Sequence, residues 1–133
     1  MKNIYLNIYK PNSHNLKMAK KIINNNNVIG LPTETVYGLA GNAYSNNAVK
    51  KIFKLKKRSS INPLIIHYKK LEDIKDDVIY NSTLVKLYKA FCPGPITFVL
   101  KKKSKSSISK IATAGKKTVA IRFPNHRVAQ NIL

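Results

Sequence analysis

The chain has 133 residues, of which 25 are Lys or Arg and only 5 are Asp or Glu, so its formal net charge is +20. This length fits a single domain, residues 1–133, and a hydrophobic fraction of 44% argues against disorder. One Cys excludes an intrachain disulfide framework and a zinc site built from several Cys ligands. No apolar stretch approaches the roughly 20 residues of a membrane span, so we expect a cytoplasmic protein without a membrane segment.

The net charge has two interpretations. All but three of the basic residues are Lys, and the chain is also rich in Asn and Ile, as an AT-rich coding sequence would produce without selection. The alternative is a surface selected to bind a polyanion such as nucleic acid. The three arginines, Arg58, Arg122 and Arg127, escape the compositional bias, and Arg is the residue best suited to bidentate contacts with phosphate or carboxylate.

Hydrophobic periodicity predicts alternating strands and helices in the first half of the chain. Residues 4–8 alternate as in a half-buried strand, and Ser13 can cap the helix that follows. The Asn run at 24–27 ends this helix, because Asn tolerates the left-handed C-cap conformation. A short apolar strand is expected at 28–31. The next helix begins at Ser45 and carries its apolar residues, Ala48, Val49, Ile52, Phe53 and Leu55, on one face.

The second half continues the alternation. Strands are expected at 64–67, 96–100 and 119–123, and a short helix with acidic residues at 71–74. A further helix starts at Ser82, with Leu84, Leu87, Tyr88 and Phe91 facing inward. The Lys- and Ser-rich segment 101–109 is predicted to be an exposed loop, and an amphipathic helix is beginning where the chain ends. This order favours an α/β or α+β fold, in which a sheet is layered with helices.

One chemically distinctive segment, residues 32–39, follows the strand at 28–31. It brings Thr33, Glu34, Thr35 and Tyr37 into what reads as a strand-to-helix connection, where open α/β sheets place their ligands. Two hydroxyls, a carboxylate and a phenol could form a binding site there. The alternative is a capping turn, in which Thr35 or Glu34 serves only backbone N–H groups.

Cations dominate a second segment, because four of the five residues at 54–58 are Lys or Arg. Lysines at a helix C-terminus commonly compensate the helix dipole, but cations this dense also suggest a bound anion. Arg122 interrupts a β-branched strand and therefore calls for a carboxylate or phosphate partner. His67 lies on a predicted strand, where a lone His more often packs than binds. Cys92 lacks a His or Asn partner pattern and is interpreted as a packing residue.

Glycine-rich phosphate-binding motifs are absent from the sequence, and so is the spacing of metal ligands. The three histidines, His14, His67 and His126, are far apart in the chain and lack nearby carboxylates, so we expect no metal held by the protein itself. A site rich in cations and hydroxyls is suited to stabilising anionic phosphates and carboxylates by electrostatics.

Four segments together resemble the YrdC-like domain family, whose best-defined members are threonylcarbamoyl-AMP synthases. They are residues 32–39, Lys56-x-Arg58 with 62–67, the Pro-Gly-Pro-Ile-Thr run at 93–97, and 119–124. The resemblance spans nearly the whole chain, and the four motifs occur in the family's order and spacing. It implies a twisted mixed sheet flanked by helices around a basic concave pocket.

The resemblance also implies a nucleotidyltransferase reaction. Family members combine L-threonine, bicarbonate and ATP, with Mg²⁺, into threonylcarbamoyl-AMP and pyrophosphate. The product serves the machinery that transfers threonylcarbamoyl to the adenosine beside the anticodon of tRNA. Because the carbamate and the triphosphate are both anions, such an enzyme must mainly neutralise charge and align the reactants.

Site residues are assigned from the resemblance motif by motif. It implies that Lys56 and Arg58 are catalytic and bind the ATP phosphates. The other implied contacts are Asn62 and Thr118 on ATP, Thr35, His67 and Arg122 on threonine, and Thr33 and Tyr37 along the pocket wall.

One departure from the family pattern concerns the end of the chain. Family members carry a Ser-x-Asn segment after the strand that contains Arg122, and it completes their phosphate-facing set. Its absence predicts a C-terminally truncated domain: either a fragment of a longer protein, or a truncated protein that lacks part of the catalytic site. The rival interpretation of the whole chain is a module that binds double-stranded RNA or tRNA without catalysis, which the net charge favours.

Overall fold

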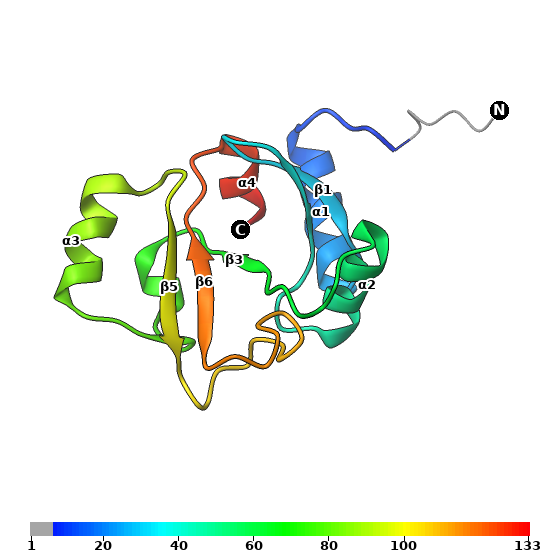
Figure 1. Cartoon of the computed structure of the whole chain (residues 1–133). Helices are drawn as coiled ribbons and strands as arrows, with labels where there is room; N and C mark the ends of the chain where they lie inside the picture. Colours follow the sequence, from blue (N-terminus) through cyan, green and yellow to red (C-terminus); the bar gives the residue numbers. More distant parts are fainter. Residues whose placement is uncertain (1–6) are drawn as a thin grey trace.

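A computed structural model describes residues 7–133 (Figure 1). The strand expected at 4–8 falls mostly outside the described residues. Four α-helices, one 3₁₀ helix and six strands follow in this part of the chain: α1 (Ser13–Asn24), β1 (Ile29–Pro32), β2 (Tyr37–Ala40), α2 (Asn46–Lys56), β3 (Ile65–His67), η1 (Leu71–Ile74), β4 (Val78–Ile79), α3 (Ser82–Phe91), β5 (Thr97–Lys102), β6 (Thr118–Arg122) and α4 (Arg127–Ile132). No helix among residues 7–133 has the length and apolarity to cross a bilayer.

Side-chain caps begin the helices near the expected positions. The Ser45 hydroxyl accepts a hydrogen bond from the Ala48 N–H at 3.3 Å and caps α2, as the sequence predicts. For α1 the cap is Asn12 and not Ser13, because the Asn12 Oδ1 accepts from the Asn15 N–H at 2.9 Å. The Asn run ends α1 as expected, with Asn26 at a left-handed φ of 57°.

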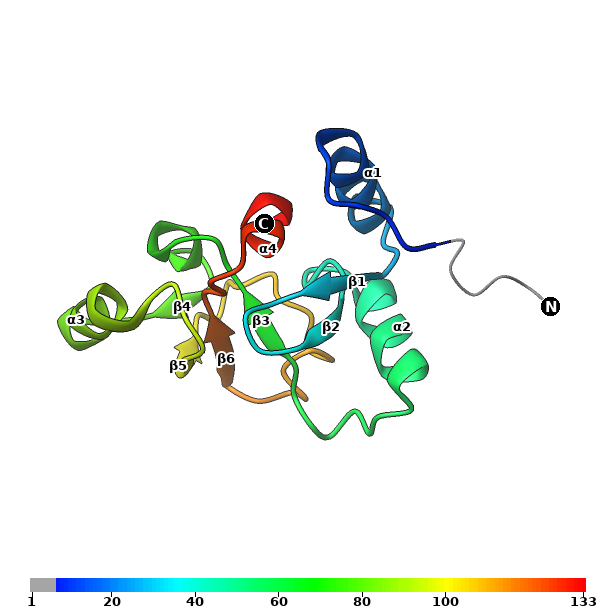
Figure 2. The same cartoon turned by 90° about the horizontal axis from the view of Figure 1, so that it is seen from above.

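The strands form two sheets. The larger has the order β3-β6-β5-β4, in which β3 pairs with β6 in parallel and the other neighbours are antiparallel. The smaller is the antiparallel pair β1–β2. Seen from above in Figure 2, α3 and α2 lie on opposite sides of the central strands, and the β1–β2 hairpin lies between β3 and α2. The predicted mixed sheet flanked by helices is therefore confirmed.

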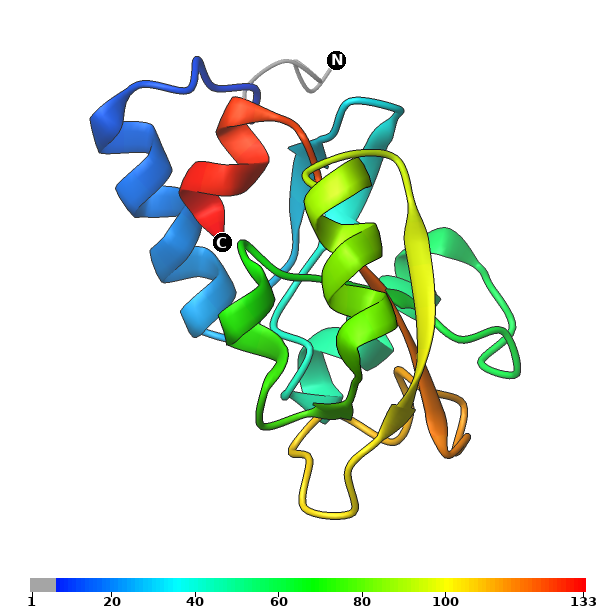
Figure 3. The same ribbon diagram turned by 90° about the vertical axis from the view of Figure 1, so that its left-hand side faces the viewer.

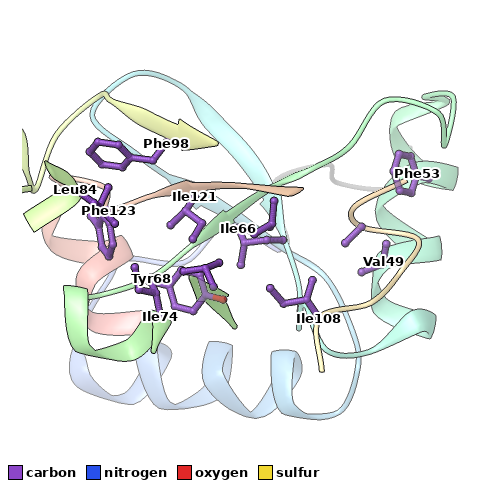
Figure 4. Close-up of a cluster of buried hydrophobic side chains, with 13 residues drawn as sticks. Val49, Phe53, Ile66, Tyr68, Ile74, Leu84, Phe98, Ile108, Ile121 and Phe123 are labelled. Carbon is purple, nitrogen blue, oxygen red and sulfur yellow. The ribbon is translucent and has the colours of Figure 1, made fainter. Parts of the chain in front are cut away.

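One face of the larger sheet carries the core. Ile66, Ile121 and Phe98 are register partners across β3, β6 and β5, and all three are buried. The view in Figure 3 shows α3 and η1 together on one side of these strands. Beyond the sheet, Figure 4 shows the cluster continuing to Phe53 of α2. The Tyr88 and Phe123 rings pack edge to face with their centroids 4.9 Å apart.

Some apolar positions do not face the core as the helical spacing predicts. Leu55 is 63% exposed at the end of α2, and Phe91 is 56% exposed at the end of α3, because the packed surface of each helix stops before its last turn. Leu87 is also exposed.

The segment 101–109 is only partly the exposed loop that its composition predicts. Its first two residues extend β5, while Ile108 and Ser109 are buried. Ile108 enters the core, and Ser109 donates a hydrogen bond to Asn46 Oδ1 at 2.6 Å. One apolar residue in a polar run thus anchors the connection between β5 and β6.

Asp77 is a buried carboxylate that the sequence analysis did not single out. It is 3% exposed and accepts hydrogen bonds from the hydroxyls of Tyr44 at 2.7 Å, Tyr68 at 2.7 Å and Ser106 at 2.6 Å. Burial and the adjacent Asp77 carboxylate raise the pKa of Tyr44 to about 12. The carboxylate joins the segments before α2, after β3 and after β5, and it is a structural centre away from the candidate site.

Candidate functional site

The side of the larger sheet opposite the core is largely open. Because neighbouring residues of a strand point to opposite faces, the register places His67, Arg122 and Thr97 in one row across β3, β6 and β5 on this face. The next row contains Ile65, Ala120 and Val99. A polar row at the carboxyl ends of β3 and β6 is therefore followed by an apolar row.

The β1–β2 hairpin supplies the second wall of the site. Residues 32–39 were interpreted as a strand-to-helix connection, and this is wrong: Tyr37–Ala40 form β2, and Pro32 pairs with Tyr37. Thr33 closes the turn, because its Oγ1 donates to the Val36 carbonyl at 2.7 Å and accepts from the Val36 N–H at 3.2 Å. The alternative of a turn named Thr35 or Glu34 as the residue that serves the backbone, but in the structure Thr33 has this role.

The hairpin turn contacts the sheet through Arg122. Arg122 Nη2 donates to Thr35 Oγ1 at 3.1 Å and lies 2.9 Å from Glu34 Oε1. The side chains of Arg122 and Glu34 are 12% and 17% exposed. The sequence predicted no partner for Glu34, since 88 positions of chain separate it from Arg122 and only the fold brings the two together.

The charges of Arg122 and Glu34 affect the pKa values at this end of the site. Burial raises the pKa of Glu34, but the Arg122 guanidinium and the backbone N–H groups of Glu34 and Asn125 lower it by more, so the carboxyl has a pKa below its ordinary value. Burial, assisted by the charge of Arg122 and opposed by Glu34, lowers the pKa of His67. His67 is therefore a neutral imidazole at pH 7, able both to donate and to accept a hydrogen bond.

The residues assigned to ATP lie toward the other end of the same strands. Lys56 ends α2, and Arg58 follows a left-handed Lys57 whose φ is 50°. Arg58 Nη2 donates to the Pro63 carbonyl at 3.2 Å, which ties the cationic loop to the start of β3. Lys56, Arg58 and Asn62 are all exposed.

Thr118 begins β6 and joins the two ends of the candidate site. Ala120 pairs with Ile65 in parallel, so the register brings Thr118 beside the residues that precede β3, where the cationic loop ends. Along β6, Arg122 lies four positions after Thr118, which is about 13 Å at the usual rise per residue. The structure thus places the two groups of assigned residues at opposite ends of one sheet face. Within residues 7–133, no hydrogen bond joins the two groups.

Two further residues, both on β5, lie beside assigned residues of β6. Thr97 is the register partner of Arg122 and Lys101 that of Thr118, and both are exposed. The sequence analysis quoted Thr97 only as part of a motif. Strand alternation in β5 could have placed it on the open face, but only the pairing with β6 brings it beside Arg122. Tyr37, assigned to the pocket wall, is 81% exposed on β2.

Other features of the described chain lie outside this site. A groove of about 560 Å³ runs between α1 and α4, away from the assigned residues, and Leu16, Lys20 and Val128 are among its lining residues. Residues 7–133 contain no group of three His, Cys, Asp or Glu side chains that could hold a metal ion. Cys92 packs half-buried against the core, and burial raises the pKa of its thiol, which agrees with the packing interpretation.

Comparison with known proteins agrees with this architecture. The Sua5/YciO/YrdC family model, described as telomere recombination, matches residues 21–133. A threonylcarbamoyl-AMP synthase of Pyrococcus abyssi is 39% identical over 121 residues, and one of Bacillus subtilis is 41% identical over 119. The crystal structure of P. abyssi Sua5 complexed with L-threonine superposes with a TM-score of 0.86 at 38% identity, covering 91% of this chain and 35% of that one.

A mixed sheet with one largely open face, crossed by an arginine-bearing strand and a hydroxyl-rich hairpin, defines the class as an α/β domain with a polar candidate site. The chain belongs to the Sua5/YciO/YrdC family. The two matched synthases each cover 89% of this chain, whereas the chain spans about a third of their length, 34% in both cases.

Proposed function

We propose that this chain carries the threonine-binding part and the Lys56–Arg58 part of the active site of a threonylcarbamoyl-AMP synthase. In the proposed reaction, the amine of L-threonine adds to CO2 derived from bicarbonate and forms a carbamate. A carbamate oxygen then attacks the α-phosphorus of ATP, and pyrophosphate leaves. The observation that carries the proposal is the polar row at the ends of β3 and β6, where Arg122 meets the Thr35 hydroxyl under the hairpin.

The amino-acid end of the site would work through charge-assisted hydrogen bonds. Arg122 would bind the threonine carboxylate, because a guanidinium is the side chain best matched to that group. Thr35 and neutral His67 would contact the remaining polar groups of the amino acid. The chain's similarity to a protein crystallised with L-threonine supports this assignment.

The nucleotide end would be the cationic loop. Lys56 and Arg58 would contact the phosphates, with Asn62 and Thr118 beside them, and the roughly 13 Å along β6 would align the carbamate with the α-phosphorus. We propose that Mg²⁺ enters bound to ATP, as part of the substrate. The described residues offer no carboxylate cluster of their own for it, and the phosphate oxygens supply suitable hard ligands.

A second role, contact with tRNA, is favoured by the net charge of +20. Lysines distributed over the surface would bind phosphates without reading sequence, and such binding falls steeply with salt. We propose it only as an adjunct to catalysis that would bring the chain close to the tRNA threonylcarbamoyl-transfer machinery. The polar row and the hairpin have no purpose in a module that binds only RNA.

The test is product formation from labelled bicarbonate. The chain, at stoichiometric concentration, is incubated with ¹³C-bicarbonate, L-threonine and MgATP, and threonylcarbamoyl-AMP is sought by mass spectrometry. We expect labelled product only when all three substrates are present, and its loss in Arg122→Ala. Arg127→Ala, which removes an exposed arginine outside the site, is the matched control. Release of AMP or ADP without labelled product would contradict the proposal.

A further inference from the structure

Glu34 has no assigned role, although it is the carboxylate beside the arginine at the amino-acid end. It is the only acidic residue of the chain outside residues 72–77. Its two oxygens are both buried, and the contact with Arg122 Nη2 at 2.9 Å is an ion pair without ordinary hydrogen-bond geometry. Shielding a carboxylate from water costs free energy unless the charge is paired or hydrogen-bonded, so the contact with Arg122 is what compensates it.

The three guanidinium nitrogens of Arg122 differ in their surroundings. Nη2 contacts both Thr35 and Glu34, on the side of the hairpin. Nε is buried without an acceptor. Nη1 makes no hydrogen bond within the described residues and is not fully buried, so it is the accessible nitrogen of the guanidinium. The guanidinium thus has a side held by the protein and a free side.

We propose that Glu34 is a positioning residue that fixes the buried side of the Arg122 guanidinium, so that Nη1 faces the carboxylate of the bound amino acid. The proposal deepens the function proposed above and rests on it for the identity of that ligand. Glu34 itself would not touch the ligand, because its oxygens are shielded from solvent. Its effect would pass through Arg122.

Two physical effects support this role. An arginine has a long side chain with many rotamers, and ordering it before the ligand arrives removes that entropy cost from binding. The turn that carries Glu34 is itself rigid, because the Thr33 hydroxyl makes two hydrogen bonds across it with Val36. A carboxylate on a closed turn is therefore a fixed anchor for a guanidinium on the neighbouring strand.

The lowered pKa of Glu34 is consistent with the same arrangement. A carboxylate that is ionised across the neutral range keeps its attraction for Arg122 at every pH at which the chain would act. The titratable group beside this pair is His67, which is neutral at pH 7 and so leaves the attraction between Glu34 and Arg122 unopposed. No other acidic side chain of the described chain lies outside residues 72–77 to replace Glu34.

The positional effect can be measured without any ligand. The chain has only three arginines, so ¹H–¹⁵N spectra should resolve three Nε–H signals, and Arg122→Lys assigns one of them. We expect the Arg122 Nε–H to exchange slowly with water in the unmodified chain. In Glu34→Gln it should exchange at least tenfold faster, whereas Glu72→Gln, which removes an exposed acid, should leave it unchanged. An unchanged signal in Glu34→Gln overturns the proposal.

Calorimetry with L-threonine then measures the consequence for binding. We expect Glu34→Gln to weaken threonine binding about tenfold, Glu34→Asp to lie between Gln and the unmodified chain, and Glu72→Gln to bind normally. MgATP binding should stay unchanged in Glu34→Gln, which a general loss of structure would not allow. Equal threonine affinity in Glu34→Gln contradicts the proposal. A third outcome separates the two proposals: the unmodified chain does not bind threonine, but Glu34→Gln still speeds the exchange of the Arg122 Nε–H with water. In that case Glu34 does position Arg122, and threonine is the wrong ligand.

Discussion

At the scale of single residues, the chemistry of the site depends on which groups are charged. His67 is a neutral imidazole because burial and the nearby Arg122 charge disfavour its protonated form. Glu34 opposes this effect but does not reverse it. The polar row therefore offers one cation, the guanidinium, and two neutral hydrogen-bonding groups, His67 and Thr97.

The depressed pKa of His67 predicts a pH dependence of stability. Below its ordinary value of 6.5 the unfolded chain binds a proton that the folded chain resists, so the free energy of unfolding should fall as the pH drops from 6.5 toward the folded-state pKa. Urea unfolding measured between pH 7 and pH 5 checks this. The slope should be smaller in His67→Gln, and an equal slope in both proteins would contradict the assigned burial.

The proposed selectivity for threonine can be tested at individual residues. If Thr35 and His67 pair with the hydroxyl of the amino acid, valine should bind far more weakly than threonine, because it leaves those groups without partners. Competition calorimetry with the two amino acids measures the ratio, and we expect at least tenfold. Similar affinities would remove Thr35 and His67 from the assignment while leaving Arg122 in place.

At the scale of elements, the predictable parts of the fold were those that local sequence determines. The helices and the strands β1, β3, β5 and β6 could be located from periodicity, because each has its apolar residues at one spacing. The strand β2 could not, since Tyr37–Ala40 lies in a hydroxyl-rich segment without a continuous apolar run, and only its pairing with β1 makes it a strand. The two-residue β4 was missed for the same reason.

The turn before β5 supplies a prediction about packing. A Cβ built on Gly94 would lie 2.5 Å from the Phe91 carbonyl oxygen, which is backbone and cannot move easily. Gly94 also donates its N–H to the Phe123 carbonyl at 2.8 Å. We expect Gly94→Ala to lower the free energy of unfolding by about 1–3 kcal/mol. Gly30→Ala is the matched control, because nothing lies within 4 Å of its Cβ, and it should cause no loss.

Asp77 supplies a second prediction, because it ties three connecting segments together. Replacing it by Asn removes a charged acceptor from three hydroxyl donors, and we expect a loss of about 2–4 kcal/mol in the free energy of unfolding. The neighbouring Asp76 is exposed, so Asp76→Asn should change stability little. Urea unfolding of the two variants makes the comparison, and equal losses would show that charge alone matters here.

At the scale of the whole molecule, the candidate site combines residues that the sequence could name with an arrangement that it could not. Arg122, His67 and Thr35 were assigned from motifs, and the fold brings Arg122 and Thr35 into contact across 87 positions of chain. The ion pair of Arg122 with Glu34 was not predicted, because nothing local in either segment reveals a partner in another sheet. The spatial order along β6, with the cationic loop at one end and the polar row at the other, required the parallel register of β3.

A chain with a net charge of +20 attracts ATP over its whole surface, so a specific ATP site must be distinguished from this diffuse attraction. If Arg58 forms a specific site, Arg58→Ala should weaken MgATP binding about tenfold, and Lys105→Ala, on the exposed connection after β5, should not. Calorimetry at two salt concentrations separates the specific contact from diffuse attraction, which salt screens. Equal losses in the two variants would mean that ATP is attracted by the surface as a whole.

The most direct measurement is the location of bound L-threonine, by ¹H–¹⁵N NMR titration of the chain. The central claim is that the amino acid binds at the carboxyl ends of β3 and β6, under the hairpin. We expect the largest shifts at the amides of Thr35, His67 and Arg122 and at the Arg122 Nε–H, with small shifts around Lys56 and Arg58. Shifts confined to the groove between α1 and α4, or spread evenly over the lysine-rich surface, would contradict the claim.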